Sequence, residues 1–232
     1  MGTVEGRFDI TRRALRDQVY ERILELLLSG EIAAGERLSI DTMARELAVS
    51  PTPVREALVQ LERTGLVTRE ALKGYRVAPP LDHDQLTELF EARLMLEETA
   101  ARLAARDAER LVPALAAAHE RHRVASAAVL AAGEGGAAVP LPVTQQYFDA
   151  DRAFHDVIFA HSANRYLEEM YDGLGALTHR MRQAALRGPE DVREAMAEHA
   201  AVLQAYESDP EAAAAAMVRH VTGVRTRSLS GH

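Results

Sequence analysis

Apolar residues recur at every third or fourth position through most of this chain, which is typical of amphipathic helices. In the first third of the chain the pattern predicts helices over residues 14–29, 39–47 and 51–63. Two short β-prone runs follow, at 66–69 and 75–78, and they predict a hairpin. Three helices followed by a hairpin are the elements of a winged helix-turn-helix domain.

The helix over 51–63 has residues suited to contacting DNA. Ser50 is placed to cap its N-terminus, and Pro51 stands at the first helical position, where a missing N–H has no cost. Thr52 and Arg55 fall on the polar side, opposite the apolar stripe. We therefore expect Ser50, Thr52 and Arg55 to contact bases or the DNA backbone. An ordinary helical hairpin with a solvated arginine would show the same pattern, so that alternative stays open.

Pro79 and Pro80 mark a boundary between two domains, because proline ends a strand and stiffens a linker. We expect a DNA-binding domain at 1–79, with an arm of no regular structure at 1–12, and a second domain at 80–232. In the second domain the apolar stripes predict six helices, over 82–106, 109–131, 143–161, 164–186, 189–207 and 210–228. An antiparallel bundle of six or seven helices would bury these stripes, so the predicted fold class is mainly α.

Composition and charge narrow the functional class. The 232 residues include no cysteine, no apolar run long enough to span a membrane and no signal-peptide pattern, so we expect a cytoplasmic protein without disulfides. The net charge is −8. Residues 1–79 carry 12 basic and 12 acidic side chains, which leaves 15 basic and 23 acidic ones in the second domain. Phosphate would repel that domain, so DNA is expected to contact the first domain only.

Four polar residues interrupt apolar stripes in the second domain. Asp151 and His155 share one face of the helix over 143–161, and His199 and His220 lie on the stripes of the last two helices. Burying an unpaired carboxylate is costly. If the four residues converge, a divalent cation held by three imidazole nitrogens and one carboxylate oxygen would neutralise Asp151. The alternative is a buried Asp151–His155 pair, with the other two histidines unrelated.

Two basic residues are further candidates for binding. Arg93 lies on the stripe of the helix over 82–106, four residues before Glu97, and either pairs with it or holds the carboxylate of a small ligand. Lys73 lies at the tip of the predicted hairpin, where it either contacts DNA or is solvated. The remaining histidines, including His122, have no comparable setting and are expected on the surface or as core filler.

Two sets of motifs carry a resemblance to a known family. With GERL at 35–38 and VSPTPVREAL at 49–58, the first domain resembles the GntR family of bacterial transcription regulators. With DADRAFH at 149–155, EHAAVLQA at 198–205 and His220, the second domain is similar to the FCD ligand-sensing domain of the FadR subfamily. Together the two resemblances cover most of the chain.

The resemblance implies a metal site and an effector. Asp151, His155, His199 and His220 occupy the positions of the metal ligands in the metal-binding members of the family. The implied cofactor is a divalent transition metal, zinc first, with nickel, cobalt, iron or manganese as the other choices. A small carboxylate effector is expected to bind at the metal and Arg93.

The resemblance also implies a homodimer that binds a pseudo-palindromic operator in double-stranded DNA, and a repressor whose operator affinity the effector controls. The chain departs from the family at Pro51, where arginine is frequent, and at Asp41, which is basic in some relatives. Two alternatives stay open. One is a metal-dependent enzyme acting on a small acid, although no HExxH motif or Ser/Cys nucleophile arrangement is present. The other is a constitutive DNA-binding protein with a purely structural metal.

Overall fold

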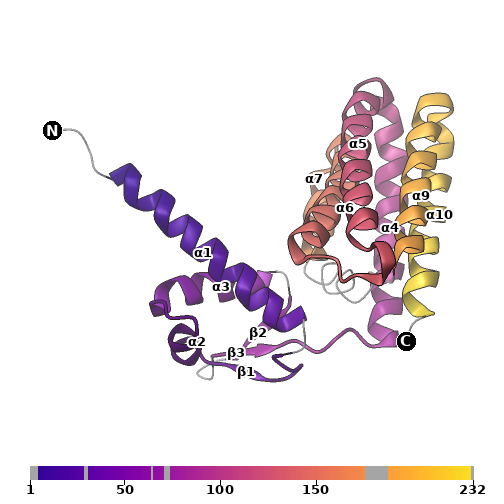
Figure 1. Ribbon diagram of the computed structural model, residues 1–232. Helices are drawn as coiled ribbons and strands as arrows, with labels where there is room; N and C mark the ends of the chain where they lie inside the picture. The colour runs from indigo at the N-terminus through magenta and orange to yellow at the C-terminus, as the bar shows by residue number, and fades with distance from the viewer. Residues whose placement is uncertain (1–4, 29–30, 64, 71–73, 176–187, 231–232) are drawn as a thin grey trace. The chain divides into compact units, whose positions relative to one another are not determined.

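The computed structural model describes residues 5–28, 31–63, 65–70, 74–175 and 188–230 (Figure 1). These residues form two compact units, the first ending at Leu81 and the second beginning at Asp82. Both units are built mainly from helices, which confirms the predicted fold class. Within the described ranges, no helix combines the length and the hydropathy needed to cross a membrane.

The first unit consists of three helices and a small sheet. Its elements, in chain order, are α1 (Glu5–Leu28), β1 (Arg37–Leu38), α2 (Ile40–Glu46), α3 (Pro51–Arg63), β2 (Val67–Glu70) and β3 (Gly74–Val77). The sheet is antiparallel, with β3 between β1 and β2. Helix α1 packs against α3, and Ile23 and Leu24 of α1 are as fully buried as Leu58 and Leu61 of α3. The unit is the predicted winged helix-turn-helix.

Two features of this unit differ from the sequence-based prediction. Helix α1 begins at Glu5, so residues 5–12, expected to form an arm, are helical; no proline interrupts the chain there. Strand β1 was not predicted, because two residues are too few to show an alternation. It pairs with β3, with Leu38 opposite Tyr75. Long-range hydrogen bonds just before it support this pairing, in which Gly35 N–H donates to Val77 O and Val77 N–H donates to Glu36 O, both at 2.9 Å.

Local sequence signals place the two helices of the helix-turn-helix. Ser39 caps α2, because its hydroxyl accepts a hydrogen bond from Thr42 N–H at 3.4 Å. In the turn, Ala48 adopts a left-handed backbone conformation with φ of 54°, which ends α2 and redirects the chain. Pro51 and Pro53 both lie in the first turn of α3, where the backbone N–H groups have no helical partner.

The second unit is a helical bundle. Its α-helices within the described ranges are α4 (His83–Ala104), α5 (Ala108–Ala132), α6 (Leu141–His161), α7 (Arg165–Gly173), α9 (Pro189–Ser208) and α10 (Ala213–Leu229). Helix α4 packs against α6 and α10, while α5 packs against α6 and α9 (Figure 1). Of the helix predicted over 164–186, the first part is α7, and residues 176–187 lie outside the described ranges.

Helix ends in the bundle also follow sequence signals. Asp82 and Gln85 form a reciprocal capping box at the start of α4, and Asn164 caps α7 by accepting from Tyr166 N–H at 3.1 Å.

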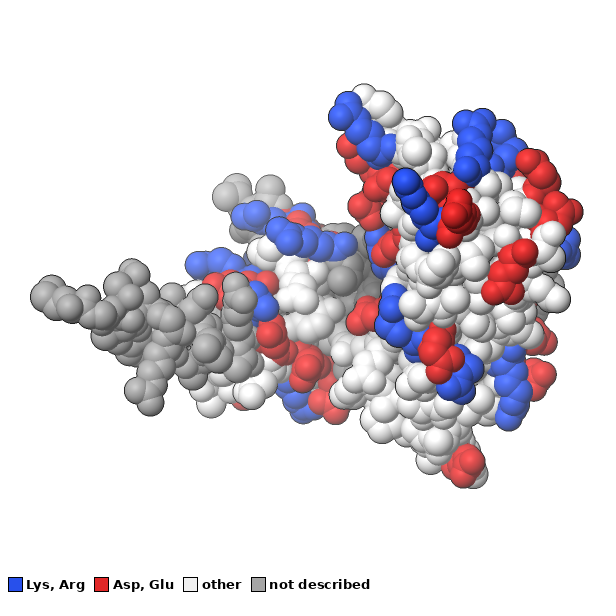
Figure 2. All heavy atoms as spheres, turned by 90° about the horizontal axis from the view of Figure 1, so that it is seen from above, with Lys and Arg blue, Asp and Glu red and all other residues white. Residues whose placement is uncertain are grey.

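On the face seen in Figure 2, basic and acidic side chains alternate over the helical bundle, so its acidic excess is not gathered into one patch there.

Candidate functional site

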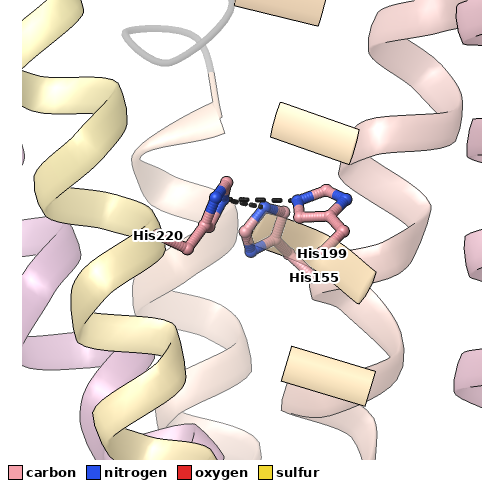
Figure 3. Close-up of side chains that lie close together, drawn as sticks. All are labelled: His155, His199 and His220. Carbon is pink, nitrogen blue, oxygen red and sulfur yellow. Dashed lines mark hydrogen bonds between the residues drawn. The ribbon is translucent and has the colours of Figure 1, made fainter. Parts of the chain in front are cut away.

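Three histidine rings from three helices converge inside the bundle. His155 of α6, His199 of α9 and His220 of α10 are all at most 2% exposed. The Nε2 atom of His220 lies 3.3 Å from that of His199 and 3.4 Å from that of His155 (Figure 3). Asp151, one turn before His155 on α6, places its Oδ1 3.6 Å from His199 Nε2. The structure therefore brings the three histidines predicted to bind a metal together and places the fourth residue, Asp151, beside His199.

Carboxylates hold two of these rings from the outside. Glu97 Oε2 of α4 lies 2.7 Å from His155 Nδ1, and Glu198 Oε2 of α9 lies 2.9 Å from His220 Nδ1. A carboxylate accepts a hydrogen bond, so in the neutral ring of His220 the proton is on Nδ1, and its Nε2 presents a lone pair to the other two rings. A cation between the three Nε2 atoms would be bound by such lone pairs.

The donor set fits a first-row transition metal. Ligands about 2.1 Å from a tetrahedral zinc lie about 3.4 Å apart. The separations of His220 Nε2 from the Nε2 atoms of His199 and His155, 3.3 and 3.4 Å, and of Asp151 Oδ1 from His199 Nε2, 3.6 Å, are close to that value. The outer carboxylates on His155 and His220 are the partners that usually orient histidine ligands. A metal bound here would act as a Lewis acid toward oxygen ligands. Ligation itself stays a prediction.

Burial keeps the histidines in the form that binds metals. Desolvation lowers the pKa of His199 well below its ordinary value and also lowers the pKa of His220, although Glu198 opposes the second shift. Both rings are therefore neutral near pH 7, with a lone pair available to a cation.

Arg93 and Glu97 form a buried ion pair on α4. Arg93 Nε donates to Glu97 Oε1 at 2.8 Å, and both side chains are almost fully buried. Burial alone would raise the pKa of Glu97, but Arg93 and His155 hold it below its usual value. The predicted pairing of Arg93 with Glu97 is thus present, and the pair is buried. Glu97 also contacts His155, one of the candidate metal ligands. A role for Arg93 in holding an effector stays a prediction.

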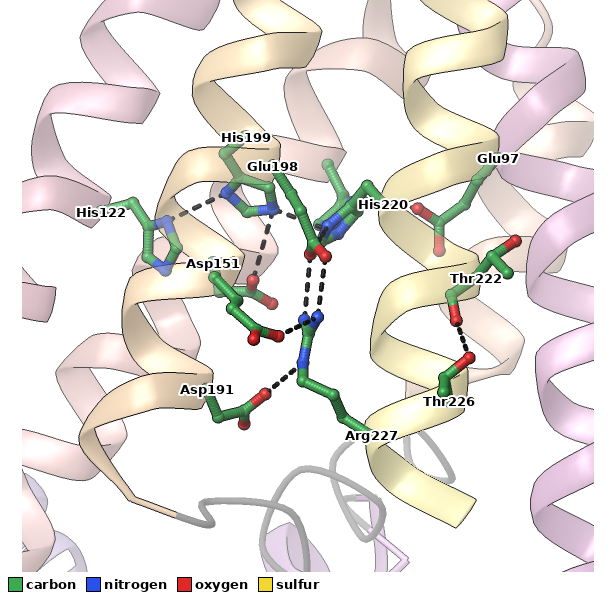
Figure 4. A network of polar contacts seen from close by, with 12 residues as sticks. Glu97, His122, Asp151, Asp191, Glu198, His199, His220, Thr222, Thr226 and Arg227 are labelled. Atoms are coloured by element: carbon green, nitrogen blue, oxygen red, sulfur yellow. Dashed lines mark hydrogen bonds and ion pairs between the residues drawn. The ribbon is translucent and has the colours of Figure 1, made fainter. Parts of the chain in front are cut away.

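A network on the outer side of His220 reaches the end of α10. Arg227 Nη1 lies 2.8 Å from Glu198 Oε1 and Arg227 Nη2 lies 3.0 Å from Glu198 Oε2, while Arg227 Nε lies 2.6 Å from Asp191 Oδ1 (Figure 4). Glu198 is thereby held in place to accept from His220. A Cβ atom added at Gly223 would overlap Glu198 Oε1, so the space for this carboxylate depends on the glycine.

Gly223→Ala is expected to weaken metal binding by about 10-fold without destabilising the fold, since loss of an outer partner costs about 10–100-fold in metal affinity. Alanine favours a helix interior over glycine by about 1 kcal/mol, so the free energy of unfolding should not fall. Competition with a chromogenic chelator measures the affinity, and urea unfolding measures the stability. Unchanged affinity would show that Glu198 does not position His220.

The stability of the metal-free protein is expected to fall as the pH is lowered from about 6.5, the ordinary histidine pKa. Desolvation lowers the folded-state pKa of His122 to about 4, and those of His199 and His220 are also lowered. Below pH 6.5 these histidines bind protons in the unfolded chain but not in the folded one. Each of them therefore lowers the free energy of unfolding by about 1.4 kcal/mol per pH unit until its folded-state pKa is reached. Urea unfolding of chelator-treated protein between pH 7.5 and 5 measures the slope; a flat profile would contradict the assignment.

Two residues of the cluster were missed by the sequence analysis. His122 of α5 was expected to be surface or filler, but it is fully buried and its Nδ1 lies 3.0 Å from His199 Nδ1. The signal was present, because His122 lies on the buried stripe of α5 between Leu115 and Val129. Glu198 was read only as part of a motif; its role as the partner of His220 depends on how α9 packs against α10.

The residues predicted to contact DNA lie at the N-terminal end of α3. Ser50, Thr52 and Arg55 are all exposed there. Within the described part of the chain, no hydrogen bond or ion pair holds the Arg55 guanidinium. Lys73 lies outside the described residues, so its placement is not part of this structure. DNA contacts by these residues stay predictions.

Comparison with known proteins agrees with the two-unit architecture. The family model for bacterial regulatory proteins of the gntR family matches residues 15–77, and the FCD domain model matches residues 88–223. The chain is 28% identical to an HTH-type transcriptional regulator of Bacillus subtilis, YcbG, over 96% of this chain and 93% of that protein. It is 28% identical to a probable D-xylose utilization operon transcriptional repressor of Paenarthrobacter nicotinovorans, over 91% of this chain and 88% of that protein.

Other similarities are shorter or more distant in sequence. An HTH-type transcriptional regulator of Mycobacterium tuberculosis is 40% identical over 80 residues, which span 32% of this chain and 33% of that protein. The solved structure of McbR/YncC of Escherichia coli superposes with a TM-score of 0.65 at 22% identity, covering 94% of this chain and 98% of that one. At that identity the superposition supports the fold alone.

Proposed function

The chain belongs to the GntR family of bacterial transcriptional regulators that carry an FCD domain, and from this premise we propose that it is a homodimeric repressor controlled by a small carboxylate at a metal site. Members of this family are regulators, so the alternative of a metal-dependent enzyme is set aside. In this proposal residues 1–79 bind DNA, and residues 80–232 bind the effector and form the dimer.

The observation that carries the proposal is the convergence of His155, His199 and His220 beside Asp151, with Nε2 atoms 3.3 and 3.4 Å apart. A divalent cation satisfies these lone pairs and the buried carboxylate together. Zinc suits the donor set, and nickel, cobalt, iron and manganese are the other choices. A metal that takes five or six ligands would keep positions open for an oxygen of the effector, whereas a metal limited to four ligands would not.

Arg93 is the cationic side chain proposed to bind the effector carboxylate. It is buried, and its charge is shared with Glu97, which in turn contacts His155 Nδ1 at 2.7 Å. A carboxylate that enters this region would therefore compete with Glu97 for Arg93 while binding the metal. Such an exchange would alter the contacts of α4, and α4 packs against both α6 and α10.

The DNA-binding half of the proposal depends on α3. Arg55 is its first candidate for a guanine or phosphate contact, with Ser50 and Thr52 on the backbone or a base edge, and Lys73 at the wing. One short helix makes few base contacts, so two copies related by two-fold symmetry are needed to read the half-sites of a pseudo-palindromic operator.

Thermal unfolding of the metal-loaded protein in a panel of small carboxylic acids tests the effector site. An acid that binds the folded state raises the unfolding temperature, by an amount that grows with the logarithm of its concentration once that concentration exceeds Kd. We expect at least one acid to stabilise the metal-loaded protein, and the same acid to have no effect after chelation. Equal stabilisation with and without metal would place the acid elsewhere and refute this site.

A further inference from the structure

His122 lies inside the bundle, directly behind one of the proposed metal ligands. It projects from α5 and is fully buried. Its ring centroid is 4.7 Å from that of His199 and 5.0 Å from that of Tyr147. His122, Asp151 and His199 each have a nitrogen or oxygen atom within 4.8 Å of those of the other two. His122 is thus a neighbour of the metal candidates, but it is not one of the four.

The contact between the two rings determines where their protons lie. His122 Nδ1 and His199 Nδ1 are 3.0 Å apart, so one nitrogen donates and the other accepts (Figure 4). In the proposed site His199 uses its Nε2 as a metal ligand, which leaves the proton of the neutral ring on Nδ1. His199 therefore donates, and His122 accepts at Nδ1. A neutral His122 then has to carry its own proton on Nε2.

That Nε2–H group is a buried donor in need of an acceptor. His122 Nε2 is shielded from solvent, and within the described part of the chain it has no hydrogen-bond partner. Leaving a buried donor unpaired is unfavourable, so such groups are usually matched by water or a ligand. His122 Nδ1 thus accepts a hydrogen bond from a proposed metal ligand, His199, while His122 Nε2 needs an oxygen acceptor.

We propose that His122 is a ligand-recognition residue, whose Nε2–H donates a hydrogen bond to an oxygen of the acid bound at the metal site. The inference rests on the proposed function and adds a residue to it. It also limits the effector class: the ligand must present an acceptor oxygen to His122, in addition to any oxygen that binds the metal.

The test uses full-length protein loaded with cobalt(II), whose visible absorption responds to its ligands, and acetate as the probe. Two variants separate the two nitrogens of His122. His122→Asn keeps an acceptor near the position of Nδ1 and removes the Nε2–H donor. His122→Gln places an amide donor near the position of Nε2 and removes the partner of His199. Each protein is titrated first with cobalt(II) under chelator competition and then, when loaded, with acetate.

We expect His122→Asn to bind cobalt(II) within about threefold of the wild type and acetate at least about 10-fold more weakly, as for loss of a hydrogen bond to a charged group. His122→Gln should show the opposite pattern, with acetate affinity retained and cobalt(II) affinity lowered by about 10-fold or more. Equal acetate affinity in the wild type and His122→Asn would overturn the inference. A wild type that binds no cobalt(II) would instead refute the proposed function, and the inference with it.

Discussion

His199→Ala is expected to reduce the metal content of protein purified without added metal from about one ion per chain to a small fraction of that value. The Nε2 atom of His199 lies 3.3 Å from that of His220 and 3.6 Å from Asp151 Oδ1, so its loss removes a central donor of the cluster. Replacing an outer partner of a metal ligand costs about 10–100-fold in affinity, and replacing a ligand should cost more. Elemental analysis by mass spectrometry measures the content.

His161→Ala is the matched control for this experiment. His161 is on α6, like His155, but its Nδ1 is 2.8 Å from the backbone oxygen of Val157 and it is not part of the cluster. The control should keep its metal. A wild type that is fully folded without any bound metal, or a His199→Ala variant with full metal content, would refute the site.

Arg55→Ala is expected to weaken operator binding by about 10-fold or more, because a bidentate arginine–base contact is worth about 1–3 kcal/mol and the proposed dimer loses two of them. Arg55 is exposed on α3, and within the described residues it forms no hydrogen bond or ion pair with another side chain. The free energy of unfolding should therefore be unchanged. The operator is obtained by selecting DNA from a random library with the wild-type protein, and fluorescence anisotropy then gives the affinities.

Arg63→Ala provides the comparison within the same helix. Arg63 is also exposed, but it is the last residue of α3, far from the end that carries Ser50 and Thr52. We expect it to change operator affinity by less than about threefold, the size of a change in general electrostatic attraction. Equal effects of the two substitutions would show that Arg55 contributes only charge.

The departures from the family bear on this interface. Pro51 is exposed at the first position of α3, where the family resemblance implies a frequent arginine, so we expect one basic contact fewer at that place. Asp41 is exposed in the first turn of α2 and would repel a nearby phosphate. We expect both changes to make operator affinity more dependent on Arg55 and on the spacing of the two recognition helices in the proposed dimer.

The sequence predicted elements that local chemistry determines. Helix α3 was predicted at its observed residues, because Ser50 and Pro51 mark its start and the apolar stripe from Val54 continues to Leu61. The start of α1 and strand β1 were missed. Strand β1 exists only through its pairing with β3, which is a contact between distant segments.

The candidate site shows the same division. Asp151 and His155 could be placed on one face from their spacing alone, because both lie on α6. Their approach to His199 and His220 depends on how α6, α9 and α10 pack. The polar residues on apolar stripes suggested it as one of two alternatives, and the family resemblance favoured it. His122 was passed over because a single histidine on an apolar stripe is usually core filler, and only the contact with His199 distinguishes it.

The central claim is that an acid at the metal site changes the affinity of the protein for its operator. The most direct test is the operator affinity of the metal-loaded protein, measured with and without an acid that stabilises it, and repeated after chelation. We expect a change of at least about fivefold with metal and none without it, which is the lower range of allosteric coupling. Identical operator affinity with every acid in the panel would contradict the claim and would leave a constitutive DNA-binding protein with a structural metal.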